Sequence, residues 1–108
     1  MKYHVVLVTA PNHRVSEKLS KGLVNQKLAA CVNCIPSVTS RYWWKGKVET
    51  SREELLVIKT VKSKLTLLIK WIKVNHPYKV CEVLVLPITG GNRPYLSWID
   101  QSLNSRQK

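Results

Sequence analysis

Residues 29–59 read AACVNCIPSVTSRYWWKGKVETSREELLVIK, and this stretch decides the fold because it predicts one long β-hairpin. Pro36 should bend the first arm or mark an edge, and Lys45-Gly46 makes the turn. The return arm reaches the apolar run Leu55–Ile58 after a polar stretch. Arms of this length extend beyond the sheet of a small domain, so we expect their free edges to pair with a second copy of the chain.

The residues before the hairpin predict a strand and a helix. The aliphatic run Val5–Val8, which ends at Ala10-Pro11-Asn12, suits a central strand buried on both faces. Asn12 can cap a helix over residues 13–28. One face of this helix is apolar, with Val15, Leu19 and Leu23.

A second helix follows the hairpin. Its spacing obeys the i, i+3, i+4, i+7 rule, with Leu65, Leu68, Ile69 and Ile72. Ser63 is its expected cap, and the apolar face is widened by Leu67, Trp71 and Val74. The helix should stop at Asn75-His76-Pro77.

The last third of the chain predicts one more strand and one more helix. Val83–Leu86 is expected to be a strand of the buried type, and Asn92 with Pro94 should start a terminal helix. The resulting order βαββαβ plus a helix is the ferredoxin-like α+β fold, an antiparallel sheet with two helices on one face. We expect residues 1–108 to form a single domain.

The composition is unusually basic. The 18 Lys and Arg against 6 Asp and Glu give a net charge of +12, which attracts polyanions and repels free cations. The alternative is a solubilising surface, since the positive residues form no run of five or more. No stretch approaches the ~18 apolar residues of a membrane span. Three cysteines are an odd number, which argues against a disulfide framework. We therefore expect a cytoplasmic location.

Several stretches together resemble one known family. They are VLVTAP from Val6, LAACVNCIP from Leu28, TSRYWWKGK from Thr39, IKT from Ile58, HPY from His76 and YLSWI from Tyr95. In this order and spacing they resemble the CutA divalent-cation-tolerance family. The resemblance implies a ferredoxin-like fold, a homotrimer similar to that of PII signalling proteins, a role in tolerance or response to divalent metal ions, chiefly copper, and no enzymatic reaction.

The resemblance also implies a metal site. His76, Tyr78 and Glu82 match family positions, but Val8 and Asn75 stand where copper-binding members carry a cysteine and a first histidine. Only His76 and Glu82 remain as ligands, which predicts weak binding of Cu(II) or another divalent metal, with no cofactor required. The competing interpretation is that His76 caps the helix end and Glu82 forms an ion pair in the trimer.

The cysteines are expected to be structural. Cys31 and Cys34 lie ~10 Å apart on opposite faces of a strand, beyond the reach of a disulfide or a shared metal. Both should be small buried side chains, with Cys31 the better core candidate. Cys81 could act as a nucleophile with His76 only if further catalytic groups were present, and none is evident.

The aromatic residues Tyr42, Trp43 and Trp44 are expected to anchor the trimer interface. The second interpretation makes them walls of a ligand cleft between subunits, as in a PII-like small-ligand sensor, with Lys59 or Arg41 holding an anion.

An RNA-binding or polyanion-binding module is the further alternative, because RNA-recognition motifs share this order of elements. Those motifs need aromatic residues on the central strands, and residues 53–60 carry none, while the first strand offers only Tyr3. We therefore expect no specific nucleic-acid partner, while non-specific polyanion contact stays open.

Overall fold

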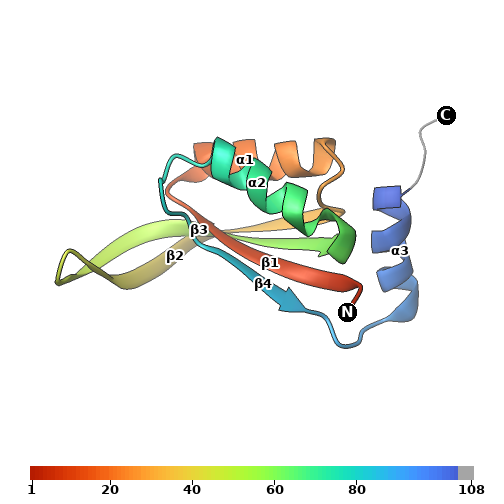
Figure 1. Ribbon diagram of the computed structural model, residues 1–108. Helices are drawn as coiled ribbons and strands as arrows, with labels where there is room; N and C mark the ends of the chain where they lie inside the picture. Colours follow the sequence, from red (N-terminus) through yellow and green to blue (C-terminus); the bar gives the residue numbers. More distant parts are fainter. Residues whose placement is uncertain (105–108) are drawn as a thin grey trace.

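Four strands form one antiparallel sheet in the order β2-β3-β1-β4 in the computed structural model, which describes residues 1–104 (Figure 1). The elements are β1 (Tyr3–Ala10), α1 (His13–Asn25), β2 (Cys31–Trp44), β3 (Lys47–Val61), the 3-10 turn η1 (Lys62–Lys64), α2 (Leu65–Asn75), β4 (Val83–Pro87) and α3 (Arg93–Asn104). Helices α1 and α2 cover one face of the sheet, while α3 stands at its end (Figure 1). The predicted ferredoxin-like α+β fold with its extra terminal helix is confirmed.

The main core lies between the sheet and the two covering helices. Its fully buried side chains come from both layers: Val6, Val8, Leu19, Leu23, Leu56, Ile58, Leu68 and Ile72, each 0% exposed. Each such side chain contributes about 1.5–3 kcal/mol relative to leaving it in water. This core is therefore assembled within a single chain.

The two helices approach closely at one glycine. A Cβ on Gly22 of α1 would lie 2.3 Å from the Trp71 ring of α2. Only a residue without a side chain allows this contact, so Gly22 sets how deeply Trp71 packs between the helices.

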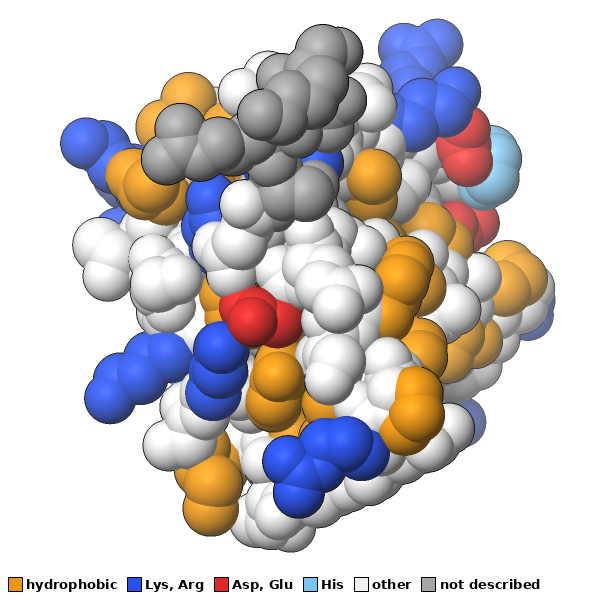
Figure 2. All heavy atoms as spheres, turned by 90° about the vertical axis from the view of Figure 1, so that its right-hand side faces the viewer, with side chains coloured by type: hydrophobic (Ala, Val, Ile, Leu, Met, Phe, Trp, Pro, Cys, Tyr) orange, Lys and Arg blue, Asp and Glu red, His pale blue; other side chains and the backbone are white. Residues whose placement is uncertain are grey.

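Helix α3 closes the far end of the sheet with a smaller core. Ile99 and Leu103 are buried against Val61, and Lys2 pairs with Asp100 at 2.8 Å. Figure 2 looks onto this end, where blue Lys and Arg side chains lie around orange apolar ones and red acidic side chains are few.

The prediction that β1 and β4 are buried on both faces is wrong. Burial alternates along β1, and on β4 Leu84 is 52% and Leu86 47% exposed. These side chains share the face that α1 and α2 leave uncovered, here called the open face: Val5, Leu7, Ile35, Leu55, Val57, Leu84 and Leu86. An uninterrupted apolar run cannot show whether anything covers its second side.

The helix boundaries also differ from the sequence prediction. Helix α1 ends at Asn25 rather than at residue 28, because Lys27 adopts a left-handed conformation with φ 59°. The N-cap of α2 is Lys64 rather than Ser63, and no side chain caps it. Leu67 and Val74 are 58% and 76% exposed, so they do not widen the buried face as predicted.

Candidate functional site

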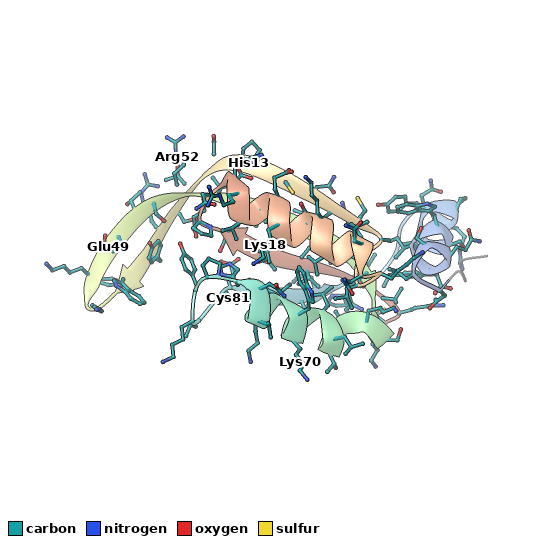
Figure 3. All side chains as sticks on the ribbon, turned by 90° about the horizontal axis from the view of Figure 1, so that it is seen from above. His13, Lys18, Glu49, Arg52, Lys70 and Cys81 are labelled. Atoms are coloured by element: carbon teal, nitrogen blue, oxygen red, sulfur yellow. The ribbon has the colours of Figure 1, made fainter. Side chains whose placement is uncertain are left out.

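The hairpin extends well beyond the rest of the sheet. Strand β3 pairs with β1 only from Glu54 to Val61, and its outer half pairs with β2 alone. We call residues 38–44 and 47–53 the ribbon. Figure 3 shows Glu49 out on the ribbon, beyond the ends of both helices. Both edges of this two-stranded segment carry backbone groups without strand partners in one chain.

The ribbon turns where the sequence predicted. Lys45 and Gly46 form a two-residue loop with φ of 50° and 79°, which is the geometry of a type I′ turn. The predicted bend at Pro36 is confirmed, because the register of β2 against β3 shifts between Ile35 and Val38. The register beyond the shift is therefore fixed from both ends of the ribbon.

The three predicted anchor residues lie on the ribbon and are exposed. Trp43 is 75% and Trp44 58% exposed, and Val48, the cross-strand partner of Trp43, is 59% exposed. Tyr42 is 41% exposed and donates a hydrogen bond from its hydroxyl to Ser51 Oγ at 3.2 Å. Indole rings left in water next to an aliphatic side chain are typical of surfaces that bind a partner.

A polar cluster lies where the ribbon leaves the sheet. Glu53 is only 8% exposed although it belongs to the predicted polar stretch. Burial raises the pKa of Tyr78, and the nearby Glu53 carboxylate and Tyr42 raise it further. Tyr42, Glu53 and Tyr78, from β2, β3 and the loop before β4, thus lie close enough to interact electrostatically. No sequence pattern links Glu53 to Tyr78, because their proximity depends on the course of that loop.

His76 is fully engaged within the chain. Its backbone N–H caps α2 by donating to Ile72 O at 2.8 Å. Its ring Nε2 lies 2.8 Å from Thr9 O, which requires Nε2 to donate, and Nδ1 accepts from the Tyr78 backbone N–H at 3.1 Å. At 7% exposure the ring therefore joins the end of β1 to the loop after α2.

The single chain does not assemble a metal site around this histidine. Neither ring nitrogen of His76 has a free lone pair in this arrangement, and Glu82 is exposed. Within residues 1–104 no group of three or more His, Cys, Asp or Glu side chains is placed to hold a metal ion. The His76 and Glu82 pair stays a prediction, and the residues of one chain do not fit the ion as arranged.

The two cysteines of the CxxC face opposite sides of β2, as expected. Cys34 packs against the main core, whereas the Cys31 thiol lies against Tyr95 of α3 and contributes to the raised pKa of that tyrosine, whose first cause is burial. The preference for Cys31 as the core residue is therefore wrong, because the inward-facing positions of β2 have even numbers here. All three cysteines are free thiols.

The expected anion holders do not converge in one chain. Lys59 lies opposite Cys31 in the sheet and donates to Asn33 Oδ1, whereas Arg41 pairs with Thr50 on the ribbon. Cys31, the β2 residue opposite Lys59, is ten residues from Arg41, which is about 33 Å at the rise of a strand. A cleft that uses both side chains needs a second subunit.

The sequence from residue 4 to 102 matches the family model described as CutA1 divalent ion tolerance protein. A protein from Oryza sativa named "Protein CutA 1, chloroplastic" is 51% identical over 91% of this chain, which spans 55% of that protein. "Divalent-cation tolerance protein CutA" of Thermus thermophilus is 44% identical, with 91% of this chain and 95% of that protein aligned.

Solved structures agree with the sequence matches. The crystal structure of CutA1 from Oryza sativa superposes with a TM-score of 0.93 at 47% identity, covering 98% of this chain and 97% of that one. The chain spans only about half to three fifths of the curated plant and frog relatives, 55% of the Oryza protein and 61% of the Xenopus laevis "Protein CutA homolog".

Proposed function

Because this chain belongs to the CutA1 divalent ion tolerance family, we propose that it acts as a non-enzymatic homotrimer, a scaffold or signalling trimer in the cellular response to divalent metal ions such as copper. The observation that carries the proposal is the ribbon. It places exposed Trp43, Trp44 and Val48 on a two-stranded segment that its own sheet leaves uncovered. A second copy of the chain can supply both the missing strand partners and the apolar contact.

The open face supports assembly on its own account. Large aliphatic side chains on β4 and β2 are exposed to water on this face: Leu84 is 52%, Leu86 47% and Ile35 44% exposed. A largely apolar sheet face of this kind, on which Asn33 and Lys59 are the polar members beside Val57 and Val5, is typical of an interface rather than of a monomer surface. Helices α1 and α2 lie on the other face (Figure 1), so an assembly through the open face leaves them outside.

The sheet edges favour a ring over a simple dimer. The two edge strands, β2 and β4, are different and lie on opposite sides of the sheet. A contact that joins β2 of one copy to β4 of the next is heterologous, and heterologous contacts close into rings when the rotation between copies allows it. We propose that the ring has three copies, in agreement with the trimer that the family resemblance implies.

The metal role rests on the family and not on a site within one chain. Relatives from Thermus thermophilus and Escherichia coli are named divalent-cation tolerance proteins. His76 is held by Thr9 and Tyr78, so a metal ion must first break the bond from Tyr78 N–H to reach Nδ1. We therefore propose weak copper binding and a response that depends mainly on the assembly.

A non-enzymatic role fits the chemistry of the described residues. Cys81 packs against the core, and both nitrogens of His76 are engaged elsewhere, so this histidine offers no base to the thiol. The cytoplasm remains our proposed location, in keeping with three free thiols.

Specific RNA readout draws no support from the sheet surface. On the open face of the two central strands Val5, Leu7, Leu55 and Val57 are aliphatic and Lys59 is charged, and the one ring, Tyr3, packs against the smaller core beside α3.

Native mass spectrometry tests the assembly. We expect a particle of about 37 kDa, three times the 12.4 kDa of one chain. The variant Trp43→Ala/Trp44→Ala should shift the population towards monomer. A wild-type protein that stays at 12.4 kDa at high concentration overturns the proposal.

Calorimetry tests the metal role separately. Copper affinity should be weak, and His76→Ala should abolish most of it. Unchanged copper binding in that variant removes His76 from the site, whatever the state of assembly.

A further inference from the structure

One segment of the chain holds a third of its basic residues, six of 18, and no acidic residue. Between Glu54 and Glu82 there are six lysines and no acidic residue. The ion pairs described for residues 1–104 involve Lys2, His13 and Lys21, all outside this segment. The positive charge between residues 55 and 81 is therefore not neutralised locally.

The exposed face of α2 combines this charge with aliphatic side chains. At 100° per residue, Lys70 lies at the centre of the exposed arc, Lys73 on one side and Leu67 with Val74 on the other. Leu67 is 58% and Val74 76% exposed. In Figure 3, which looks onto the helix layer, Lys70 points away from α1.

The loop after α2 continues the same pattern. Lys79 is exposed, and Val80 is 89% exposed. A hollow of about 280 Å³ lies between helix and loop, lined by Ile69, Lys73, Lys79, Val80, Cys81 and Val83. Lys73 and Lys79 are the charged residues of this lining, and the other four residues are apolar. We call the exposed residues of α2 and the loop the Lys70 face: Leu67, Lys70, Lys73, Val74, Lys79 and Val80.

We propose that the Lys70 face binds the surface of bilayers that contain anionic phospholipids. Lysines attract the negative surface potential of such a bilayer, while exposed Leu67, Val74 and Val80 enter the boundary between headgroups and acyl chains. Lys73 and Lys79 both line the hollow, so either can contact a lipid phosphate there while the adjoining carbons meet its apolar walls. The protein lies on the bilayer and does not cross it, in keeping with the absence from the described residues of any helix long and apolar enough to span one.

The side chains of this face favour lipid over nucleic acid. Its charges are all lysines, which act as compact point charges, and it has no arginine to form bidentate contacts with phosphate and no aromatic ring for base stacking. Nucleic acid would also gain nothing from exposed Leu67 and Val74. Because the face lies on the helix side, opposite the open face, the inference does not depend on the proposed trimer.

Vesicle co-sedimentation tests the proposal. The full chain is mixed with vesicles of phosphatidylcholine alone or of phosphatidylcholine with phosphatidylglycerol, and binding is expected only to the anionic vesicles. Lys70→Glu should weaken that binding roughly fivefold or more, given about 1 kcal/mol for each lysine near an anionic surface. Arg93→Glu is the matched control, since it makes the same change of charge on α3 and should weaken binding less.

The decisive variant keeps the charge constant. Leu67→Ser/Val74→Ser should lower binding to anionic vesicles by about tenfold, because two aliphatic side chains no longer enter the bilayer. Val24→Ser, at a 42% exposed position of α1, is its matched control. Circular dichroism checks that each variant folds, and the vesicle assay counts only folded variants.

Three outcomes overturn the proposal. They are equal binding to neutral and anionic vesicles, unchanged binding of folded Leu67→Ser/Val74→Ser, and retention of the wild-type chain by single-stranded RNA without retention by anionic vesicles. The first removes the role of charge, the second that of the aliphatic side chains, and the third identifies nucleic acid as the partner.

Discussion

The inner and outer halves of β3 differ in one respect that matters for function. In the inner half, Leu56 and Ile58 are completely buried under α1 and α2, whereas in the outer half every residue from Lys47 to Thr50 is exposed. Both halves are strand and pair with β2, on either side of the register shift between Ile35 and Val38. Backbone pairing alone therefore does not finish this structure. The inner half is complete within one chain, and the outer half requires a surface that another molecule supplies.

Alanine substitutions on the two halves of β3 should show the largest difference between them. Leu56→Ala should lower the free energy of unfolding by about 2–5 kcal/mol, because it leaves a cavity in a packed core. Val48→Ala should change the stability of an isolated chain by less than about 0.5 kcal/mol, since Val48 is exposed. Urea denaturation at low protein concentration measures both. Equal losses for the two variants contradict the division.

The second prediction concerns the helix layer that completes the inner half. Gly22→Ala should cost about 1–3 kcal/mol, because the new Cβ overlaps the Trp71 ring and the ring must move. Gly90→Ala is the control, as a Cβ at Gly90 meets nothing within 4 Å. Thermal unfolding followed by circular dichroism compares the two variants, and an unchanged melting temperature for Gly22→Ala shows that the helices do not depend on this contact.

The sequence predicts what depends on neighbouring residues. The turn at Lys45-Gly46, the shift near Pro36 and the end of α2 at Asn75 follow from local chemistry, and the structure has them as expected. These are properties of backbone conformation, which the side chain at each position restricts directly.

What depends on distant coverage is not predictable in the same way. The apolar run of β4 reads as buried, yet Leu84 and Leu86 are half exposed because no helix lies over them. Glu53 is only 8% exposed although it stands in a polar stretch, and its influence on the pKa of Tyr78 joins residues that are distant in the sequence. For the candidate site, the sequence therefore identified the aromatic residues but not the polar cluster beside them.

The third prediction uses the boundary between the two halves, where Tyr78 lies. Burial, Glu53 and Tyr42 all raise the pKa of Tyr78 above its ordinary value of about 10. The folded state therefore keeps the tyrosine proton longer than the unfolded state does. This contribution to stability is complete below about pH 10 and is lost as the pH rises through the folded pKa.

Absorbance titration of the tyrosines measures this effect. Glu53→Gln should lower the pKa of Tyr78, because a nearby negative charge is removed, and Tyr78→Phe identifies its transition. The loss of stability at alkaline pH should be smaller in Tyr78→Phe than in the wild type. A Tyr78 transition that is unaffected by Glu53→Gln shows that the carboxylate is not close enough to matter.

Hydrogen exchange of the ribbon tests the central claim most directly. If copies of the chain cover the ribbon, peptides from residues 41–53 should exchange as slowly as peptides from the buried part of β3 at high concentration. In Trp43→Ala/Trp44→Ala the same peptides should exchange much faster, with the inner half of β3 unchanged. Fast exchange of the wild-type ribbon at every concentration would contradict the claim that a second copy completes this half of the molecule.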